Sequence, residues 1–208
     1  MGSLKKTLVL KIDPDNPDGK LIRYAAGVLR AGGLVAFPTE TVYGLGANLL
    51  DEEAIDRLYK VKARPRNKPF TVHIAALGQM KALGCALDGR AKKLAGKFWP
   101  GPLTMVIKAK GGGSVGFRLP ANKVAIELIK AAGVPVVAPS ANLSGANPPT
   151  DAGEVLKDLD GKIDVVIDSG PTDVGVESTV VDLTAEGFGV LREGAVKKEE
   201  IEKILSDE

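Results

Sequence analysis

The chain has 208 residues, of which 28 are Lys or Arg and 26 are Asp or Glu, so its formal net charge is only +2. This length allows a domain to bury most of its apolar surface without disulfides or a structural metal. The near balance of charge gives no argument for a nucleic-acid-binding protein, and a single Cys and a single His exclude an intramolecular disulfide and a multi-cysteine or His-rich metal site.

The N-terminal residues contain no recognisable targeting signal. Their apolar run is interrupted by Lys11 and Asp13, which makes it too short for a signal peptide or a membrane span. Gly2 and Ser3 start like a myristoylation signal, but that pattern needs a hydroxyl at position 6, where this chain has Lys6. We therefore expect a soluble, cytoplasmic protein with no membrane partner.

Short apolar runs rich in β-branched residues predict the strands. Several runs are continuous rather than alternating, which is typical of strands covered on both faces. In chain order they are Leu8–Ile12, Leu34–Phe37, Phe70–Ile74, Leu103–Ile107, Pro135–Ala138, Val165–Ile167, Thr179–Leu183 and Gly189–Leu191.

Amphipathic patterns typical of helices separate many of these runs. Helices are expected over Leu21–Ala31 and Val196–Leu205 and after caps at Asp51, Asp88, Asn122 and Asp151. Glu154, three residues after Asp151, gives the pattern of a capping box. Together these elements predict an α/β fold with a mixed sheet and flanking helices. The composition does not shift along the chain, so we expect one domain over residues 1–208 with a core at about 15–196.

The segment from Phe37 to Gly46 contains the first group of residues suited to bind a ligand. Thr39 and Thr41 carry hydroxyls that can donate to a carboxylate or accept from an ammonium group. Gly44 and Gly46 would let the backbone approach a ligand closely. An ordinary turn between a strand and a helix explains the same pattern about equally well.

A cluster of cations lies where Pro65 ends the helix predicted after Asp51: Lys62, Arg64, Arg66 and Lys68. Cations at a helix C-terminus also complement the helix dipole, and that explanation accounts for one or two of them. The guanidinium fork suits phosphate oxygens, and lysine supplies a compact charge. The cluster therefore favours an anion site over a purely structural role.

Further polar residues follow later strands. Ser140 and Asn142, in PSAN, come directly after a buried strand, where α/β sheets place ligands, although Pro, Ser and Asn also build ordinary turns. GVEST and LREG repeat this theme of polar residues near strands with Ser178 and Arg192. His73 lies within a predicted strand, a setting more typical of a hydrogen-bonded, half-buried residue than of a catalyst.

The segment from Gly111 to Pro120 combines a triple glycine with Ser114 and Arg118. It predicts either a mobile hairpin turn with an exposed arginine or a lid that brings Arg118 onto a carboxylate. The chain contains no P-loop and no dinucleotide-binding glycine pattern, so the common nucleotide cradles are absent. Phe98 and Trp99 favour a core edge rather than a base-stacking surface.

Taken in order, the segments PTETVYGLG, KARP with KPF, FWPGPLT, GFRLP, PSAN, ESTVVDL and LREG resemble the YrdC-type threonylcarbamoyl-adenylate synthase family. The resemblance spans about Ala25 to Val196. It implies a twisted α/β sheet with a concave cationic face, in the short form of the family without the additional C-terminal domain of longer members. It also implies a nucleotidyltransferase that converts ATP, L-threonine and bicarbonate or CO2 into threonylcarbamoyl-AMP and pyrophosphate.

The resemblance implies three sets of site residues. The threonine-binding set is Thr41, His73, Arg118, Ala138 and Ser178. The ATP-binding set is Arg64, Lys68, Ser114, Ser140 and Arg192, and the catalytic tetrad is Lys62, Arg64, Ser140 and Asn142. Two positions depart from the family's pattern: Lys68 stands where relatives often have Asn, and Pro148 lies where they often have Ser.

The implied chemistry needs no protein nucleophile. Threonine and CO2 or bicarbonate give a carbamate, whose oxygen attacks the α-phosphate of ATP. Lys62, Arg64 and Arg192 would neutralise charge developing on the phosphate oxygens, with Mg²⁺ carried by ATP and no metal site in the protein. Arg118 would hold the threonine carboxylate and His73 would contact the threonine side chain. The product would pass to downstream machinery that makes N6-threonylcarbamoyladenosine in tRNA.

Two other functions fit parts of the pattern. A translation or ribosome-assembly factor would use a concave cationic surface on double-stranded or structured RNA, although the near-neutral charge weakens this reading. Binding of structured RNA or tRNA would also be compatible with the enzyme. A carbamoyl-transfer domain of the hydrogenase-maturation type shares the fold, but that protein needs zinc-finger segments for which one Cys is insufficient.

Overall fold

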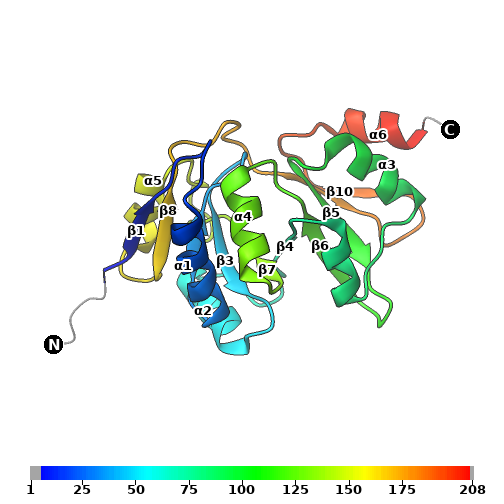
Figure 1. The fold of residues 1–208 in the computed structure, drawn as a ribbon. Coiled ribbons are helices and arrows are strands. Elements are labelled where there is room, and N and C mark those ends of the chain that lie inside the picture. The colour runs from blue at the N-terminus through cyan, green and yellow to red at the C-terminus, as the bar shows by residue number, and fades with distance from the viewer. Residues whose placement is uncertain (1–5, 207–208) are drawn as a thin grey trace.

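The computed structural model of the chain describes residues 6–206, so the Gly2-Ser3 start lies outside the described residues. Within this range the strands form one sheet in the order β1-β8-β2-β3-β7-β4-β6-β5-β9-β10 (Figure 1). The strands are β1 (Leu8–Lys11), β2 (Val35–Phe37), β3 (Gly44–Asn48), β4 (Val72–His73), β5 (Leu103–Lys108), β6 (Ser114–Arg118), β7 (Val136–Val137), β8 (Val165–Asp168), β9 (Thr179–Asp182) and β10 (Gly189–Arg192). The helices are α1 (Gly19–Arg30), α2 (Glu52–Lys62), α3 (Gly89–Phe98), α4 (Lys123–Ala132), α5 (Ala152–Leu159) and α6 (Lys198–Ser206), with a 3₁₀ helix, η1, at Leu77–Leu83.

Strand directions in the sheet are mixed. β1 and β2 both run parallel to β8, whereas β2 and β3 pair antiparallel. In the other half, β4 runs parallel to β6 and β5 runs parallel to β9, while β5 and β6 form an antiparallel hairpin. Every predicted strand and helix is present, which confirms the α/β fold with a mixed sheet and flanking helices. That residues 1–208 form one domain stays a prediction.

Apolar side chains are buried on both faces of the sheet, as the continuous apolar runs predicted. On β2, Val35 and Phe37 belong to the cluster formed with α1 and α4, whereas Ala36 belongs to the cluster that includes residues of α2 and α5. β8 divides in the same way, with Val165 in the first cluster and Val166 in the second. Side chains alternate between the faces of a strand, so each of these strands contributes to two cores.

The layer of α1 and α4 covers only part of one face. Its apolar cluster takes side chains from β1, β2, β7 and β8 but, within residues 6–206, none from β5, β6 or β9. Those three strands instead contribute to the other cluster, the one that contains Ala36 and Val166. That cluster also includes residues of α3 and α6, which lie at the other end of the molecule (Figure 1). The opposite face of β5 and β6 is therefore open to a ligand.

The helix starts follow the predicted caps. The side chains of Asp51, Asp88 and Asn122 each accept a backbone N–H of the first turn. Asp151 caps α5 as predicted, but Glu154 accepts from the backbone N–H of Thr150, one residue earlier than in a capping box. No helix in the described part of the chain is long and apolar enough to cross a lipid bilayer.

Strands β3 and β6 lie where the sequence predicted no strand, and β3 is glycine-rich. β3 pairs with β2 and places Gly46 against Phe37, where a Cβ would come within 3.0 Å of the aromatic ring. Gly46 therefore serves close packing in the core, not ligand approach. Gly44, at the start of the same strand, does line a pocket.

Candidate active site

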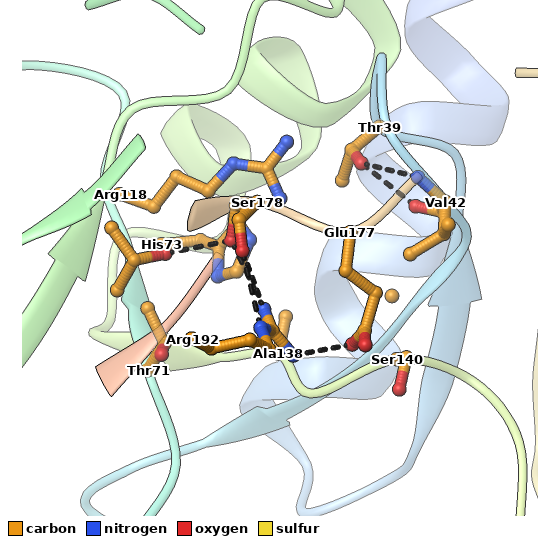
Figure 2. Close-up of a pocket in the computed structure, with 12 residues that line it drawn as sticks. Thr39, Val42, Thr71, His73, Arg118, Ala138, Ser140, Glu177, Ser178 and Arg192 are labelled. Atoms are coloured by element: carbon orange, nitrogen blue, oxygen red, sulfur yellow. Dashed lines mark hydrogen bonds and ion pairs between the residues drawn. The ribbon is translucent and has the colours of Figure 1, made fainter. Parts of the chain in front are cut away.

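Two adjoining pockets are built on the sheet and its loops. The small pocket, about 350 Å³, is lined by Thr39, Val42, Gly44, Thr71, His73, Thr104, Arg118, Ala138, Ser140, Glu177, Ser178 and Arg192 (Figure 2). The large pocket, about 1630 Å³, extends to α2 and the loop after it and includes Arg64, Lys68, Phe70 and Ser114. The residues that line both pockets are Thr71, Ser140, Glu177 and Arg192. The two pockets therefore meet at a junction that carries two hydroxyls, a carboxylate and a guanidinium.

Strand alternation brings the polar residues of the small pocket to one face of the sheet. Thr104 lies between two core residues of β5, and Arg118 follows the core residue Phe117 on β6. Because successive side chains point to opposite faces, Thr104 and Arg118 face away from that core. His73 of β4 pairs in register with Arg118 and shares its face.

Arg118 is buried beside a carboxylate. Its Nη2 lies 2.8 Å from Glu40 Oε1 and donates to Thr41 Oγ1 at 2.7 Å, while its Nε donates to the Gly101 carbonyl at 3.3 Å. Burial lowers the pKa of Arg118, and Glu40 acts against that lowering. Among the described residues Nη1 has no hydrogen-bond partner, so this nitrogen is available to an anionic ligand.

Thr41 contacts this arginine directly, and Thr39 contacts Thr41. Thr39 Oγ1 donates to the Val42 carbonyl at 2.7 Å and lies 2.9 Å from Thr41 Oγ1. Because the Thr39 proton is used on that carbonyl, Thr41 is the donor between the two hydroxyls. Thr39 lines the small pocket, whereas Thr41 contacts Arg118 and lies behind the lining. Thr41 thus lies beside Arg118 rather than in the lining, and its contact with threonine stays a prediction.

His73 is fully buried and uncharged. Burial lowers its pKa to about 3, and the charge of Arg118 acts in the same direction. Its ring packs edge-on against Phe37 at a centroid distance of 6.4 Å. Within residues 6–206, Nδ1 finds no hydrogen-bond partner. The expected half-buried position is therefore wrong, because the ring is buried, whereas a hydrogen bond to the Thr71 backbone agrees with the predicted hydrogen-bonded role. Nδ1 of this pocket-lining residue stays unpaired.

Arg192 and Glu177 form an ion pair where the pockets meet. Arg192 Nη1 lies 2.6 Å from Glu177 Oε1, and Nε and Nη2 donate to the Ser178 carbonyl at 3.1 and 2.9 Å. Ser178 Oγ lies 2.9 Å from Thr104 Oγ1. At Gly194, in LREG, a Cβ would lie 2.1 Å from the Glu177 carbonyl oxygen. Only glycine at this position lets the LREG segment pack against the EST segment.

Arg64 forms part of the wall of the large pocket. Its Nε and Nη2 donate to the carbonyls of Lys68 and Pro69 at 3.0 and 3.2 Å, and its guanidinium lies 5.3 Å from the centre of the Phe70 ring. Phe70 in turn stacks on Tyr59 at 4.3 Å. Cation and aromatic ring thus stand side by side, as a ligand with phosphates and a flat base would require. All residues of the predicted ATP-binding set line this pocket.

Lys62 and Asn142 lie beneath the lining. Lys62 is 2% exposed, and its Nζ donates to the Asn142 carbonyl at 2.7 Å and to the Ser140 carbonyl. Burial lowers the pKa of Lys62 to about 8, and the charge of Arg64 adds to this. Asn142 Nδ2 donates to the carbonyls of Leu143 and Ala146. Both residues therefore shape the PSAN loop that presents Ser140.

Two sequence interpretations are corrected here. Arg66 belongs to the predicted cation cluster but pairs with Asp56 and lies over Tyr59 on the exposed side of α2. Arg118 is neither exposed nor carried on a lid, because Ser114–Arg118 is strand β6 and Arg118 is 4% exposed. The prediction of a core edge at Trp99 is confirmed, since its Nε1 donates to the Leu103 carbonyl from a buried position.

The sequence analysis missed two acidic residues of the site. Glu40 sits between the two threonines of PTET and pairs with Arg118, and Glu177 precedes Ser178 in EST. A signal was present in both cases: each is a carboxylate inside a motif otherwise assigned to anion binding. A pattern of cations and hydroxyls alone predicts an anion site and passes over the carboxylates within it.

Comparison with known proteins identifies the family of this chain. The Sua5/YciO/YrdC family model, described as "Telomere recombination", matches residues 27–194. The threonylcarbamoyl-AMP synthase of Pyrococcus abyssi (strain GE5 / Orsay) is 47% identical over 89% of this chain and 57% of its own length. A putative threonylcarbamoyl-AMP synthase of Mycobacterium tuberculosis (strain CDC 1551 / Oshkosh) is 36% identical over 93% of this chain and 92% of its own.

The structural comparison agrees with the sequence comparison. The crystal structure of P. abyssi Sua5 complexed with L-threonine superposes with a TM-score of 0.91 at 44% identity, covering 96% of this chain and 61% of that one. The chain thus spans less than two thirds of the length of these two P. abyssi proteins. The chain belongs to the Sua5/YciO/YrdC family.

Proposed function

We propose that this chain is an L-threonylcarbamoyladenylate synthase, which makes threonylcarbamoyl-AMP and pyrophosphate from L-threonine, bicarbonate or CO2, and ATP. The observation that carries the proposal is the junction of a small, partly cationic pocket with a larger one through Ser140 and Arg192. A reaction between an amino acid and a nucleotide needs two such compartments in contact. The names of the relatives, and the threonine bound to P. abyssi Sua5, support the same substrates.

Threonine would occupy the small pocket. Arg118 would bind its carboxylate through Nη1, and the network of Glu40 and Thr41 would fix the orientation of that guanidinium. His73, neutral and unpaired at Nδ1, would meet the threonine side chain. Ala138 and Ser178 would complete the wall.

ATP would occupy the large pocket. Arg64, Lys68 and Arg192 would bind the phosphates, and the Tyr59–Phe70 wall offers a surface for the base. Within the described residues no group of three or more His, Cys, Asp or Glu could hold a metal ion, and Glu177 is the one carboxylate of the lining. Mg²⁺ would enter with ATP and would neutralise phosphate charge.

The chain's own contribution to the reaction is placement and charge. Carbamate oxygen and α-phosphate would meet at the junction, where Ser140 and Arg192 face both pockets. Lys62 and Asn142 would hold the Ser140 loop in place through its carbonyls. Arg64 and Arg192 would stabilise the charge that develops as pyrophosphate leaves. Transfer of the product to tRNA by further proteins, and direct contact with structured RNA, remain parts of the proposal.

The direct test is product formation. The purified protein is incubated with ATP, Mg²⁺, bicarbonate and L-threonine, and threonylcarbamoyl-AMP is sought by mass spectrometry. We expect the product only when all components are present. Absence of the product, together with salt-sensitive RNA binding that is indifferent to threonine, would favour the RNA-binding alternative.

A second arm tests amino-acid specificity. A site with a buried polar partner for the threonine hydroxyl rejects alanine, because that partner is then left unpaired. We expect much slower pyrophosphate release with alanine than with threonine. Equal rates would contradict the proposed position of the threonine side chain at His73.

A further inference from the structure

Glu177 is the only acidic side chain, among the described residues, that lines either pocket. The charged residues around it are Arg64, Lys68, Arg118 and Arg192. Burial lowers the pKa of Lys62, Arg64 and Arg118, and the charge of Glu177 acts against that lowering at each of them. Its carboxylate is therefore within electrostatic reach of Lys62, Arg64 and Arg118. A negative charge here weakens triphosphate binding, so its presence calls for another role.

The ion pair with Arg192 uses only part of this carboxylate. The pair joins Glu177 Oε1 to Arg192 Nη1, while the other two nitrogens of that guanidinium donate to the Ser178 carbonyl. Arg192 is thus anchored without help from Glu177. Oε2 has no hydrogen bond or ion pair within residues 6–206, and the side chain is 30% exposed. In Figure 2 the carboxylate lies between Arg192 and Ser140, at the junction of the pockets.

An amino acid brings two opposite charges into the small pocket. Arg118 complements the carboxylate, but it cannot bind the ammonium group. The hydroxyls of Thr104 and Ser178 are already within hydrogen-bond distance of each other. A carboxylate is the strongest acceptor for an ammonium group. We propose, on the basis of the proposed function, that Glu177 binds the α-ammonium group of threonine through Oε2 and so places the reacting nitrogen at the junction.

The electrostatic interaction between Glu177 and the bound group changes from attraction to repulsion during the reaction. To react, the ammonium group first releases a proton to solvent. The free amine then forms an N–C bond to CO2 and releases a second proton, so a carbamate anion replaces the positive charge beside Glu177. Glu177 then repels the group that it had bound, and Arg192, in the same junction, attracts it toward the phosphates. An interaction that attracts the substrate before carbamate formation and repels the anion afterwards does not bind the two equally, and it therefore promotes forward movement.

The test is a binding cycle without ATP. Calorimetry measures the affinities of L-threonine and of 2,3-dihydroxybutanoate, in which a hydroxyl replaces the ammonium group, for the wild-type chain and for Glu177→Gln. We expect Glu177→Gln to weaken threonine binding by at least ~10-fold, the scale of a lost charge-assisted hydrogen bond, and to leave binding of the analogue unchanged. Glu193→Gln, which removes a surface carboxylate paired with Lys197, should change neither affinity.

Other outcomes overturn the inference. Equal weakening of both ligands would mean that Glu177 only positions Arg192, and unchanged threonine binding would mean that it has no part in recognition. Weaker ATP binding by Glu177→Gln, without any loss of threonine affinity, would assign the carboxylate to the nucleotide and its metal instead. If the wild-type chain does not bind threonine, the proposed function fails with the inference. Glu177→Asp, which keeps the charge, should retain part of the preference for threonine and guards against a folding defect in Glu177→Gln.

Discussion

Cations at a helix C-terminus usually project into solvent, but Lys62 is buried beneath the lining of the pockets. The structure places it on the buried stripe of α2 with Ala54 and Leu58, four residues apart. That spacing is visible in the sequence and indicates a buried lysine. Its partners, two carbonyls of the PSAN loop, lie far along the chain and could not be predicted.

Replacement of Lys62 by methionine tests the role of this buried charge. Lys62→Met removes the donor to the Ser140 and Asn142 carbonyls but keeps the volume of the side chain. We expect a loss of about 2 kcal/mol in the free energy of unfolding, the scale of hydrogen bonds to a charged group. Urea unfolding measures it, with Lys60→Met on the exposed side of α2 as the matched control. Equal stability of the two variants would contradict the assignment.

Arg64 and Arg66 form a natural pair for comparison. Arg64 lines the large pocket, whereas Arg66 pairs with Asp56 outside it. We expect Arg64→Ala to reduce formation of threonylcarbamoyl-AMP by at least ~10²-fold, the scale of a lost transition-state charge partner. Arg66→Ala should retain nearly full activity in the same assay. A folded Arg64→Ala protein with normal activity would reject the role of Arg64.

The buried His73 makes stability depend on pH. Its pKa is about 3 in the folded chain and near 6.5 when unfolded, so between these values the unfolded state binds a proton that the native state does not. Stability from this group is present above pH 6.5 and is lost as the pH falls, by up to about 1.4 kcal/mol per pH unit. Urea unfolding at pH 7, 6 and 5 measures the free energy of unfolding of the wild type and of His73→Asn. The difference between the two free energies should narrow as the pH falls. A difference that does not change with pH would refute this.

At the level of elements, the strands and helices with strong apolar patterns were predictable and the glycine-rich ones were not. β3 contains Gly44 and Gly46, and β6 follows the triple glycine, so both look like loops in a single sequence. Their partners across the sheet, not their own propensities, make them strands. The hairpin of β5 and β6 then fixes Arg118, which the sequence suggested was mobile or exposed.

Gly194 tests the contact between the LREG and EST segments. In Gly194→Ala the new Cβ would lie 2.1 Å from the Glu177 carbonyl oxygen, so the two segments must separate. We expect a loss of about 1–3 kcal/mol in unfolding free energy, typical of overpacking, and weaker binding of ATP as Arg192 is displaced. Gly189→Ala, where a Cβ meets nothing within 4 Å, is the control in β10. Unchanged stability and ATP affinity in Gly194→Ala would show that the contact is not needed.

At the scale of the whole molecule, the sequence could suggest that distant motifs converge. It could not show on which part of the sheet they meet. Ser140 follows β7, Ser178 directly precedes β9 and Arg192 ends β10, so their positions at strand ends suggested a site at the sheet. Which face they share depends on where α1 and α4 stop covering the sheet, and that is a property of the assembled fold. The junction at Glu177 is also a property of the assembled fold. No local sequence pattern shows that one carboxylate lines two pockets.

A crystal structure of the chain with L-threonine and an ATP analogue whose α–β bridge cannot be cleaved tests the central claim most directly. We predict the threonine carboxylate on Arg118 in the small pocket and the triphosphate on Arg64 and Arg192 in the large one, with the amino nitrogen and the α-phosphate facing each other across the junction. Either ligand bound at a separate surface, or the two bound without contact at Ser140 and Arg192, would contradict it.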